Sequence, residues 1–133
     1  MPLKGISIMD NSTGLSVAGG TGVTLTETSV AVAGGVNVAD HTQADFRLRR
    51  HVTFRNRNPV RQNNGEFSKA KRSFVFTTPI QDSVGVIRYI TTRWEQETPV
   101  EATAVAELNH RRMAAQFQFD ADAEAFHTTG SVA

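Results

Sequence analysis

Apolar and polar residues alternate between residues 44 and 57, and this alternation limits what the chain can fold into. The even positions from Phe46 to Phe54 are apolar apart from Arg50, and the odd positions from Arg47 to Arg57 are polar and mostly basic. A period of two is typical of a β-strand with one dry face and one solvated face. The pattern predicts a long strand over residues 44–57 whose polar face carries positive charge.

Two further strands with the same segregation follow. Residues 58–65 contain a proline and an Asn-Gly pair, which predict a hairpin connection. A return strand is predicted from about residue 67 to 78 and, after a loop over residues 79–85, a third strand over residues 86–98. Polar side chains again fall mainly on the odd positions.

The start of the chain is punctuated by glycine and its end is helical. Val and Thr together number 29 against five Leu, which favours strands. Short strands or hairpins are predicted over residues 6–9, 14–17, 22–26 and 35–38. Residues 100–117 contain helix formers without Gly or Pro and predict a helix, and residues 120–126 predict a second short one.

Together these elements predict an α+β fold with an N-terminal β-hairpin, an antiparallel sheet of about five strands and a C-terminal helix or two helices. The 133 residues fit a single domain (1–133), with a hairpin region over 1–34, the sheet over 35–98, the helical region over 99–126 and a tail over 127–133. A helix about 10 Å wide covers roughly two strands. We therefore expect an obligate homodimer in which a second copy supplies its helices to cover the sheet.

The charge distribution points to nucleic acid. Lys and Arg number 14 against 13 Asp and Glu, a formal net charge of +1 that by itself argues against such a partner. Nine of the basic residues nevertheless lie between residues 46 and 72, where Glu66 is the one acid, so this hairpin carries +8. A positive, solvated sheet face attracts phosphate, and aromatic or hydroxyl side chains beside it suit unpaired bases.

Other chemistry is not indicated. The chain has no cysteine, and its four histidines fall on separate elements without metal-ligand spacing. The Gly19–Gly22 stretch lacks the Lys of a phosphate loop, and no Ser-His-Asp pattern is present. Glu95 and Glu97 share a strand face beside Arg93, which favours an acidic rim or ion pairs between subunits. We expect no enzyme activity, no cofactor and no metal.

No targeting signal or membrane span is indicated either. The first ten residues reach an acid without an apolar core, and no run approaches 18 apolar residues. We expect a protein that does not span a membrane and is made in the cytoplasm.

Three stretches carry a resemblance to a known family: residues 88–103, which run from a strand into a helix, the Asp-Asn-Ser-Thr-Gly turn at 10–14, and the small-residue ending at 128–133. With the basic-faced strands, the size and the order of elements, the whole chain resembles the coat protein of small single-stranded RNA bacteriophages, the levivirus-like group. Two features depart from the best-known pattern: the first strand carries more arginine, and the loop before the third strand is short.

The resemblance implies a dimer with one continuous sheet, each helix clasping the partner, and assembly into an icosahedral capsid in the bacterial host cytoplasm. The polar sheet face would point inward and bind genomic RNA, including a hairpin operator that represses replicase translation in studied members. The loop over residues 79–85 matches the segment that meets around the symmetry axes. The candidate RNA-binding residues are Arg47, Arg49, His51, Thr53, Arg55, Arg57, Lys69, Lys71, Ser73, Val75, Thr77, Tyr89, Thr91, Arg93 and Glu95.

Two other classes stay open at this point. A cellular, dimeric RNA-binding regulatory module would use the same basic sheet without forming shells. A phage tail or fibre β-domain would have a sheet face without nucleic-acid contact.

Overall fold

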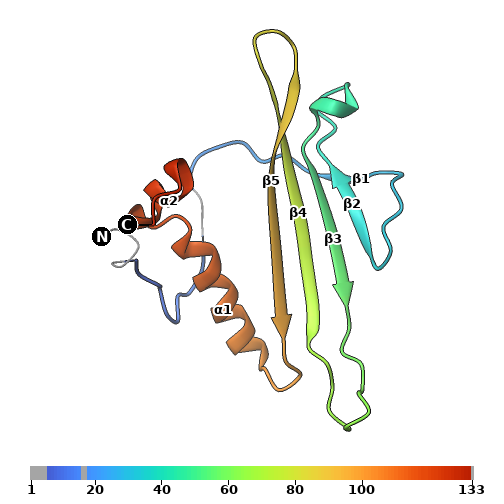
Figure 1. Ribbon diagram of the computed structural model, residues 1–133, viewed down its shortest axis with the longest axis vertical. Coiled ribbons are helices and arrows are strands. Elements are labelled where there is room, and N and C mark those ends of the chain that lie inside the picture. The colour runs from blue at the N-terminus through green and yellow to red at the C-terminus, as the bar shows by residue number, and fades with distance from the viewer. Residues whose placement is uncertain (1–5, 16–17, 133) are drawn as a thin grey trace. The chain divides into compact units, whose positions relative to one another are not determined.

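The computed structural model describes residues 6–15 and 18–132 and divides the chain into two compact units. One unit spans Gly20–Val100, and the other combines Met1–Gly19 with Glu101–Ala133. The first holds the sheet and the second holds the helices (Figure 1).

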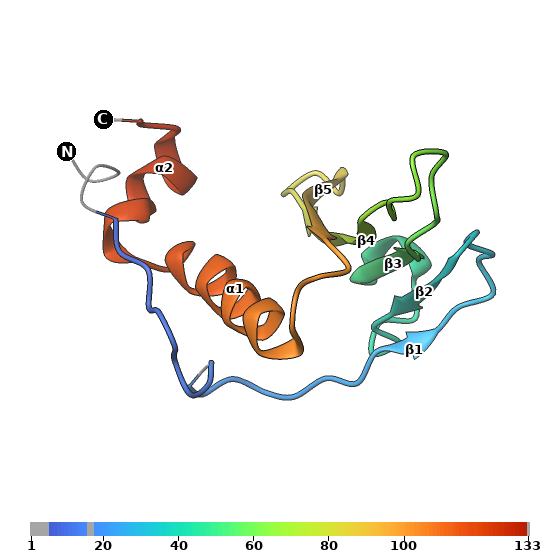
Figure 2. The same cartoon turned by 90° about the horizontal axis from the view of Figure 1, so that it is seen from below.

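The sheet unit is an antiparallel sheet of five strands that follow one another in chain order (Figures 1 and 2). The strands are β1 (Thr26–Glu27), β2 (Gly35–Ala39), β3 (His51–Arg57), β4 (Ala70–Gln81) and β5 (Ile87–Thr98). The predicted fold class is confirmed, because the short and long strands, connected by turns, pair into one antiparallel sheet. The edges of the sheet are the two-residue β1 and the twelve-residue β5.

The predicted strand over residues 44–57 is wrong in its first half. A 3-10 helix, η2 (Phe46–Leu48), precedes β3, which begins at His51. Asp45 caps η2 by accepting a hydrogen bond from the Arg47 backbone N–H, and the Arg49 guanidinium donates to the Gln43 carbonyl at 2.8 Å. These local side-chain bonds satisfy the backbone outside the ladder, which is how a sequence with strand periodicity turns away from the sheet.

The predicted loop over residues 79–85 is also shorter than expected. β4 continues through Pro79 to Gln81, and its pairing with β3 stops at Thr77. Proline is tolerated in a strand where one side of the ladder is absent. The true turn begins at Asp82, whose carboxylate accepts from the backbone N–H groups of Val84 and Val86 at 3.0 and 2.9 Å.

The hairpin between β3 and β4 keeps one register over its whole length. His51 lies opposite Thr77 at one end, and an isolated bridge pairs Arg61 with Phe67 near the tip. Residues 58–69, between the two strands, form an arm that extends past the end of β5 (Figure 1).

The helical unit contains α1 (Ala104–Phe117), η3 (Ala121–Ala123) and α2 (Glu124–Thr129). Thr103 caps α1 by accepting from the Ala106 N–H at 3.1 Å. Gly130 ends α2 in the left-handed conformation, with φ 75°. Both predicted helices are therefore present.

The N-terminal segment corrects a third expectation. The described residues 6–15 form no strand, although strands were expected over 6–9 and 14–17; Ser16 and Val17 lie outside the described residues. The segment lies along α1 instead. The Asn109 amide accepts from the Asn11 N–H at 2.9 Å and donates to the Asp10 carboxylate at 2.9 Å, and Arg112 donates to the Ser12 carbonyl at 2.8 Å. The only predicted early strands that form are β1 and β2, within the part of the chain that the structure describes.

The sheet unit leaves its apolar face largely uncovered. Among the described residues, the buried apolar side chains are Ala39, Val52, Ala70 and Ala123. Large apolar side chains of the even-numbered face stay exposed, with Phe54 at 45% and Ile90 at 56%. A sheet whose apolar face is covered so little needs further protein packed on that face to form a core.

Candidate nucleic-acid interface

The strand register places the odd-numbered residues of β3, β4 and β5 on one face. Thr53 lies opposite Val75, and Val75 lies opposite Arg93, so the face runs straight across three strands. Because successive side chains alternate, the apolar residues Phe54, Phe74 and Trp94 occupy the other face. The segregation predicted from the sequence is confirmed from His51 onward.

At one end of this odd-numbered face is a pocket of about 280 Å³. It is lined by Val30, Asn37, Phe46, His51, Thr77 and Tyr89. The rings of Phe46 and His51 lie 4.7 Å apart between centroids, tilted by 60°. The Tyr89 hydroxyl donates to the Arg47 carbonyl at 3.1 Å and thereby ties η2 to β5. Flat rings beside hydroxyl and amide groups are what an unpaired base requires of a protein pocket.

Asn37 forms the polar floor of the pocket. Its side chain is 7% exposed, donates from Nδ2 to Thr53 Oγ1 at 2.8 Å, and accepts at Oδ1 from Thr28 Oγ1 at 2.7 Å. Sequence reasoning missed Asn37. The signal that could have found it is its odd-numbered place on β2, since the register sets it opposite Thr53.

The charges on this face are unevenly distributed. Arg55 and Arg57 are exposed on β3, whereas Glu95 and Glu97 lie on β5. Lys71 on β4 pairs with Glu95 at 3.1 Å. The face is therefore basic toward β3 and acidic toward the β5 edge.

The remaining basic residues of the hairpin lie in other places. Arg50 turns to Asp40, Arg72 shares the even-numbered face, and Arg61 lies in the arm beyond the sheet. The sequence total of +8 thus does not gather on one face.

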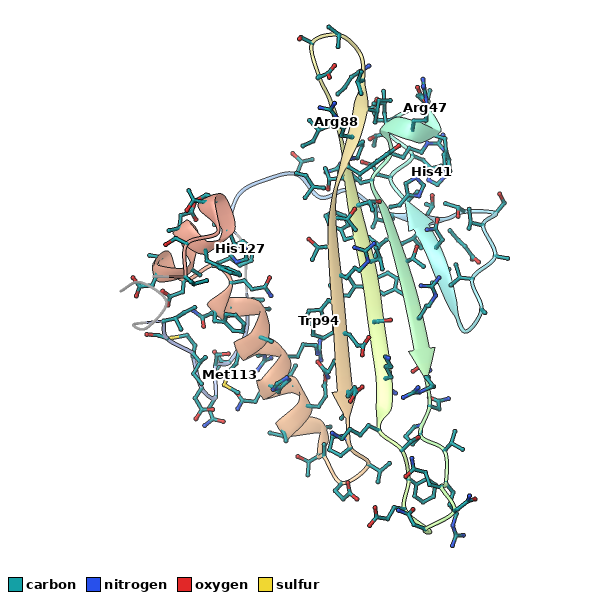
Figure 3. The ribbon with its side chains drawn as sticks, in the orientation of Figure 1. His41, Arg47, Arg88, Trp94, Met113 and His127 are labelled. Atoms are coloured by element: carbon teal, nitrogen blue, oxygen red, sulfur yellow. The ribbon has the colours of Figure 1, made fainter. Side chains whose placement is uncertain are left out.

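Twelve of the fifteen predicted RNA-binding residues share the odd-numbered face. They are His51, Thr53, Arg55, Arg57, Lys71, Ser73, Val75, Thr77, Tyr89, Thr91, Arg93 and Glu95. Arg47 and Arg49 lie instead in and just after η2, where Arg47 pairs with Asp45 at 3.0 Å (Figure 3). Lys69 precedes β4, in the arm.

A buried carboxylate fixes the loop that leads to the pocket. Asp40 is 2% exposed and accepts from Thr42 Oγ1 at 2.7 Å, the Thr42 N–H at 2.9 Å and Arg50 Nε at 3.0 Å. The hydrogen bonds from Thr42 first, and then from Arg50, lower the pKa of Asp40 from 3.8 to about 2. This contact explains why Arg50 interrupts the apolar positions of the sequence.

The described residues offer neither a metal site nor a membrane-spanning helix. Within residues 6–15 and 18–132, no three His, Cys, Asp or Glu side chains gather as a metal site would need. No helix in the described part of the chain is long and apolar enough to cross a membrane.

Comparisons with known proteins bear on the family. No protein-family model matches the chain, and no curated protein matches it. Among solved structures, the virus-like particle of bacteriophage GQ-907 is similar at 32% sequence identity with a TM-score of 0.89, covering 98% of both chains. The virus-like particle of Beihai levi-like virus 21 is similar in fold, with a TM-score of 0.66 at 14% identity, covering 95% of this chain and 94% of that one. With a five-stranded antiparallel sheet, two C-terminal helices and a relative of this identity over nearly its whole length, the chain belongs to the coat proteins of levi-like, single-stranded RNA bacteriophages.

Proposed function

We propose that this protein is the coat subunit of a phage shell: it dimerises, assembles into an icosahedral capsid in the cytoplasm of a bacterial host, and packages single-stranded RNA. The observation that carries the proposal is the two-sided sheet, with a polar, partly basic odd-numbered face and an uncovered apolar face. One face suits RNA and the other suits protein. A structural role in a capsid needs no catalytic group.

The dimer follows from what each unit leaves exposed. Phe54 and Ile90 on the sheet are 45% and 56% exposed, and α1 has no buried residue. Apolar burial contributes about 25 cal/mol for each Å² removed from water, so a second copy that covers this surface is strongly favoured. In a dimer with a twofold axis, each copy would bury the exposed apolar surface of the other.

RNA contact on the odd-numbered face would combine two kinds of interaction. Arg55 and Arg57 are exposed and suited to phosphate oxygens, which fix position without reading sequence. The pocket between His51 and Tyr89 suits one unpaired base, which is the element that recognition of an operator hairpin needs. Arg47, Arg49 and Lys69 lie outside the strand ladder and would extend the phosphate contacts beyond the sheet.

The test of the coat function is expression of the chain alone in bacteria, followed by electron microscopy and ultraviolet absorbance of the purified material. Roughly spherical particles that contain RNA are expected. Dimers that bind RNA but never form shells would support the regulatory module instead, and particles without RNA would remove packaging from the proposal.

A pair of double variants tests the RNA face. Arg55→Ala with Arg57→Ala is expected to lower the RNA content of the particles, because two exposed phosphate ligands are lost. Arg88→Ala with Arg111→Ala is the matched control, since both arginines are exposed, Arg88 aligns with the even-numbered face and Arg111 lies on α1. Equal RNA loss in both variants would contradict the assignment of the face.

A further inference from the structure

The tip of the arm holds an Asn-Gly pair that the proposed function does not use. Asn64 is the only one of the seven asparagines in the sequence that is followed by a glycine. Residues 61–67 are all exposed, so water reaches the pair. Asparagine is among the thermolabile residues of proteins, and a glycine after it lets the next backbone nitrogen approach its side-chain amide closely. The tip therefore combines a reactive residue pair with access to water.

We propose that Asn64 is a site of spontaneous deamidation, at which the backbone nitrogen of Gly65 attacks the side-chain amide. The Gly65 nitrogen bonds to Asn64 Cγ, the bond from Cγ to Nδ2 breaks, and the proton of the Gly65 N–H leaves with Nδ2 as ammonia. Water then opens the cyclic imide. Addition of water at Cγ gives aspartate, and addition at the Asn64 backbone carbonyl carbon gives isoaspartate. The reaction consumes water and releases ammonia, without a cofactor or an oxidant.

A hydrogen bond already polarises the amide that is attacked. Asn64 Oδ1 accepts from the Glu66 N–H at 3.0 Å. Attack at Cγ moves negative charge onto Oδ1, and a donor already placed at that oxygen stabilises the charge as it develops. The turn thus presents an electrophilic carbon next in the chain to the attacking nitrogen.

Gly65 leaves the attacking nitrogen uncrowded. Its φ is 83°, in the left-handed region that favours glycine. Among the described residues, a Cβ added to Gly65 would meet only the Arg61 guanidinium, at 4.0 Å. Asn63, in the same turn, is instead followed by Asn64, whose side chain crowds the nitrogen that would attack it. The reaction is therefore favoured at Asn64 over its neighbour.

The same turn must open before the reaction can proceed. The Gly65 N–H donates to the Gln62 carbonyl at 3.0 Å and has to leave it before the nitrogen can attack. The tip is also held by the Gln62 N–H, which donates to the Glu66 carbonyl at 2.7 Å, and by the bridge between Arg61 and Phe67. Exposed backbone hydrogen bonds of this kind open locally at a low free-energy cost. We therefore expect deamidation of the folded protein and not only of unfolded chains.

The modification changes the charge of the arm. Arg61 and Lys69 against Glu66 give residues 58–69 a formal charge of +1, and a carboxylate at position 64 lowers it to zero. The formal net charge of the whole chain, +1, falls to zero at the same time. A protein near zero net charge associates more readily. The modified chains should elute as a separate, more acidic form in ion exchange.

Peptide mass spectrometry of the full-length protein tests the site without any variant. The protein is incubated at mildly alkaline pH, where the attacking N–H loses its proton more readily. Trypsin cuts after Arg61 and Lys69, so one peptide carries both Asn63 and Asn64. Asn64 is expected to convert at least about tenfold faster than Asn63, which is about 1.4 kcal/mol in activation free energy. The product should appear as two peaks of equal mass, aspartate and isoaspartate.

An internal control and a variant complete the test. Asn58 should stay unmodified, because Pro59 follows it and has no N–H proton to lose. Gly65→Asn adds a side chain to the attacking residue and keeps a residue type that tolerates the left-handed conformation. It should slow the conversion of Asn64 at least about tenfold. If the variant distorted the arm, the comparison of Asn63 with Asn64 in the unchanged chain would still decide.

Three results would overturn the inference. Asn63 could convert as fast as Asn64, a folded Gly65→Asn variant could convert at the wild-type rate, or aspartate could form without isoaspartate, which would mean direct hydrolysis by water. Each of these results leaves the coat function standing, because none of them depends on the assembly of particles or on RNA.

Discussion

Arg50 donates to the carboxylate of Asp40 from Nε at 3.0 Å, and this contact joins the end of β2 to the start of β3. The Asp40 N–H in turn donates to the Arg50 carbonyl at 2.9 Å. With Thr42 bound to the same carboxylate, the loop that carries η2 is anchored at its base. The wall of the pocket therefore depends on an ion pair between a buried carboxylate and a half-exposed arginine, which no alternation of residues would suggest.

The Asp40 carboxylate predicts a defined acid sensitivity. Its pKa is lowered from 3.8 to about 2 in the folded protein, so its contribution to stability is complete above about pH 4 and is lost as the pH falls toward 2. The urea midpoint, measured at fixed protein concentration, is expected to decline over this window. Asp40→Asn should flatten the decline. Arg50→Gln should remove only part of it, because the Thr42 hydrogen bonds are the larger cause of the shift. An unchanged slope in Asp40→Asn would contradict the prediction.

Replacing the buried Asn37 is expected to lower the stability of the fold. Asn37→Ala removes the side-chain hydrogen bonds that the hydroxyls of Thr28 and Thr53 make to the Asn37 amide, which costs about 1–3 kcal/mol. Thr91→Ala is the control, because Thr91 is exposed on the same face. Chemical unfolding of the two variants measures the difference. If the two lost equal stability, the floor of the pocket would be no tighter than its surroundings.

The face of the sheet could be predicted from the sequence, whereas the ends of its strands could not. Alternation reports which side a residue occupies once it is in a strand, and it was correct from His51 to Arg57. Alternation does not report side-chain hydrogen bonds that compete with strand pairing. The bonds of Asp45 and Arg49 favour the 3-10 helix η2 over a strand in the residues before β3. Pro79 was placed in a loop, although the missing β3 partner beside it lets it stay in β4.

The pocket shows the same limit. His51, Thr77 and Tyr89 were predicted as members of one face and are confirmed there. Asn37 and Phe46 were not predicted, since the first depends on the β2 register and the second on a helix that the period of two disguised. Contacts that depend on tertiary pairing leave little trace in a single sequence.

The exposed arginines on β3 predict a change in salt dependence. Removing Arg55 and Arg57 together is expected to reduce the slope of log K against log salt for single-stranded RNA by about 1.4, or about 0.7 for each lost phosphate contact. Filter binding of dissociated subunits across a salt series measures the slope. The Arg88→Ala and Arg111→Ala control should keep the wild-type slope. An altered affinity with an unaltered slope would mean that these arginines act through the fold and not through phosphate.

A side chain at position 35 is expected to clash with β3 where β2 pairs with it. A Cβ added to Gly35 would lie 1.7 Å from the Phe54 carbonyl oxygen, which is backbone and cannot swing aside. Gly35→Ala must therefore separate the two strands, and overpacking of this kind costs about 1–3 kcal/mol or more. Gly22→Ala is the matched control, since its added Cβ meets nothing within 4 Å and its φ is not positive. Thermal unfolding should show a marked loss for the first variant and little change for the second. Because β2 carries Asn37, the same substitution should also weaken RNA binding, and a Gly35→Ala protein with wild-type stability and binding would show that β2 does not pair as described.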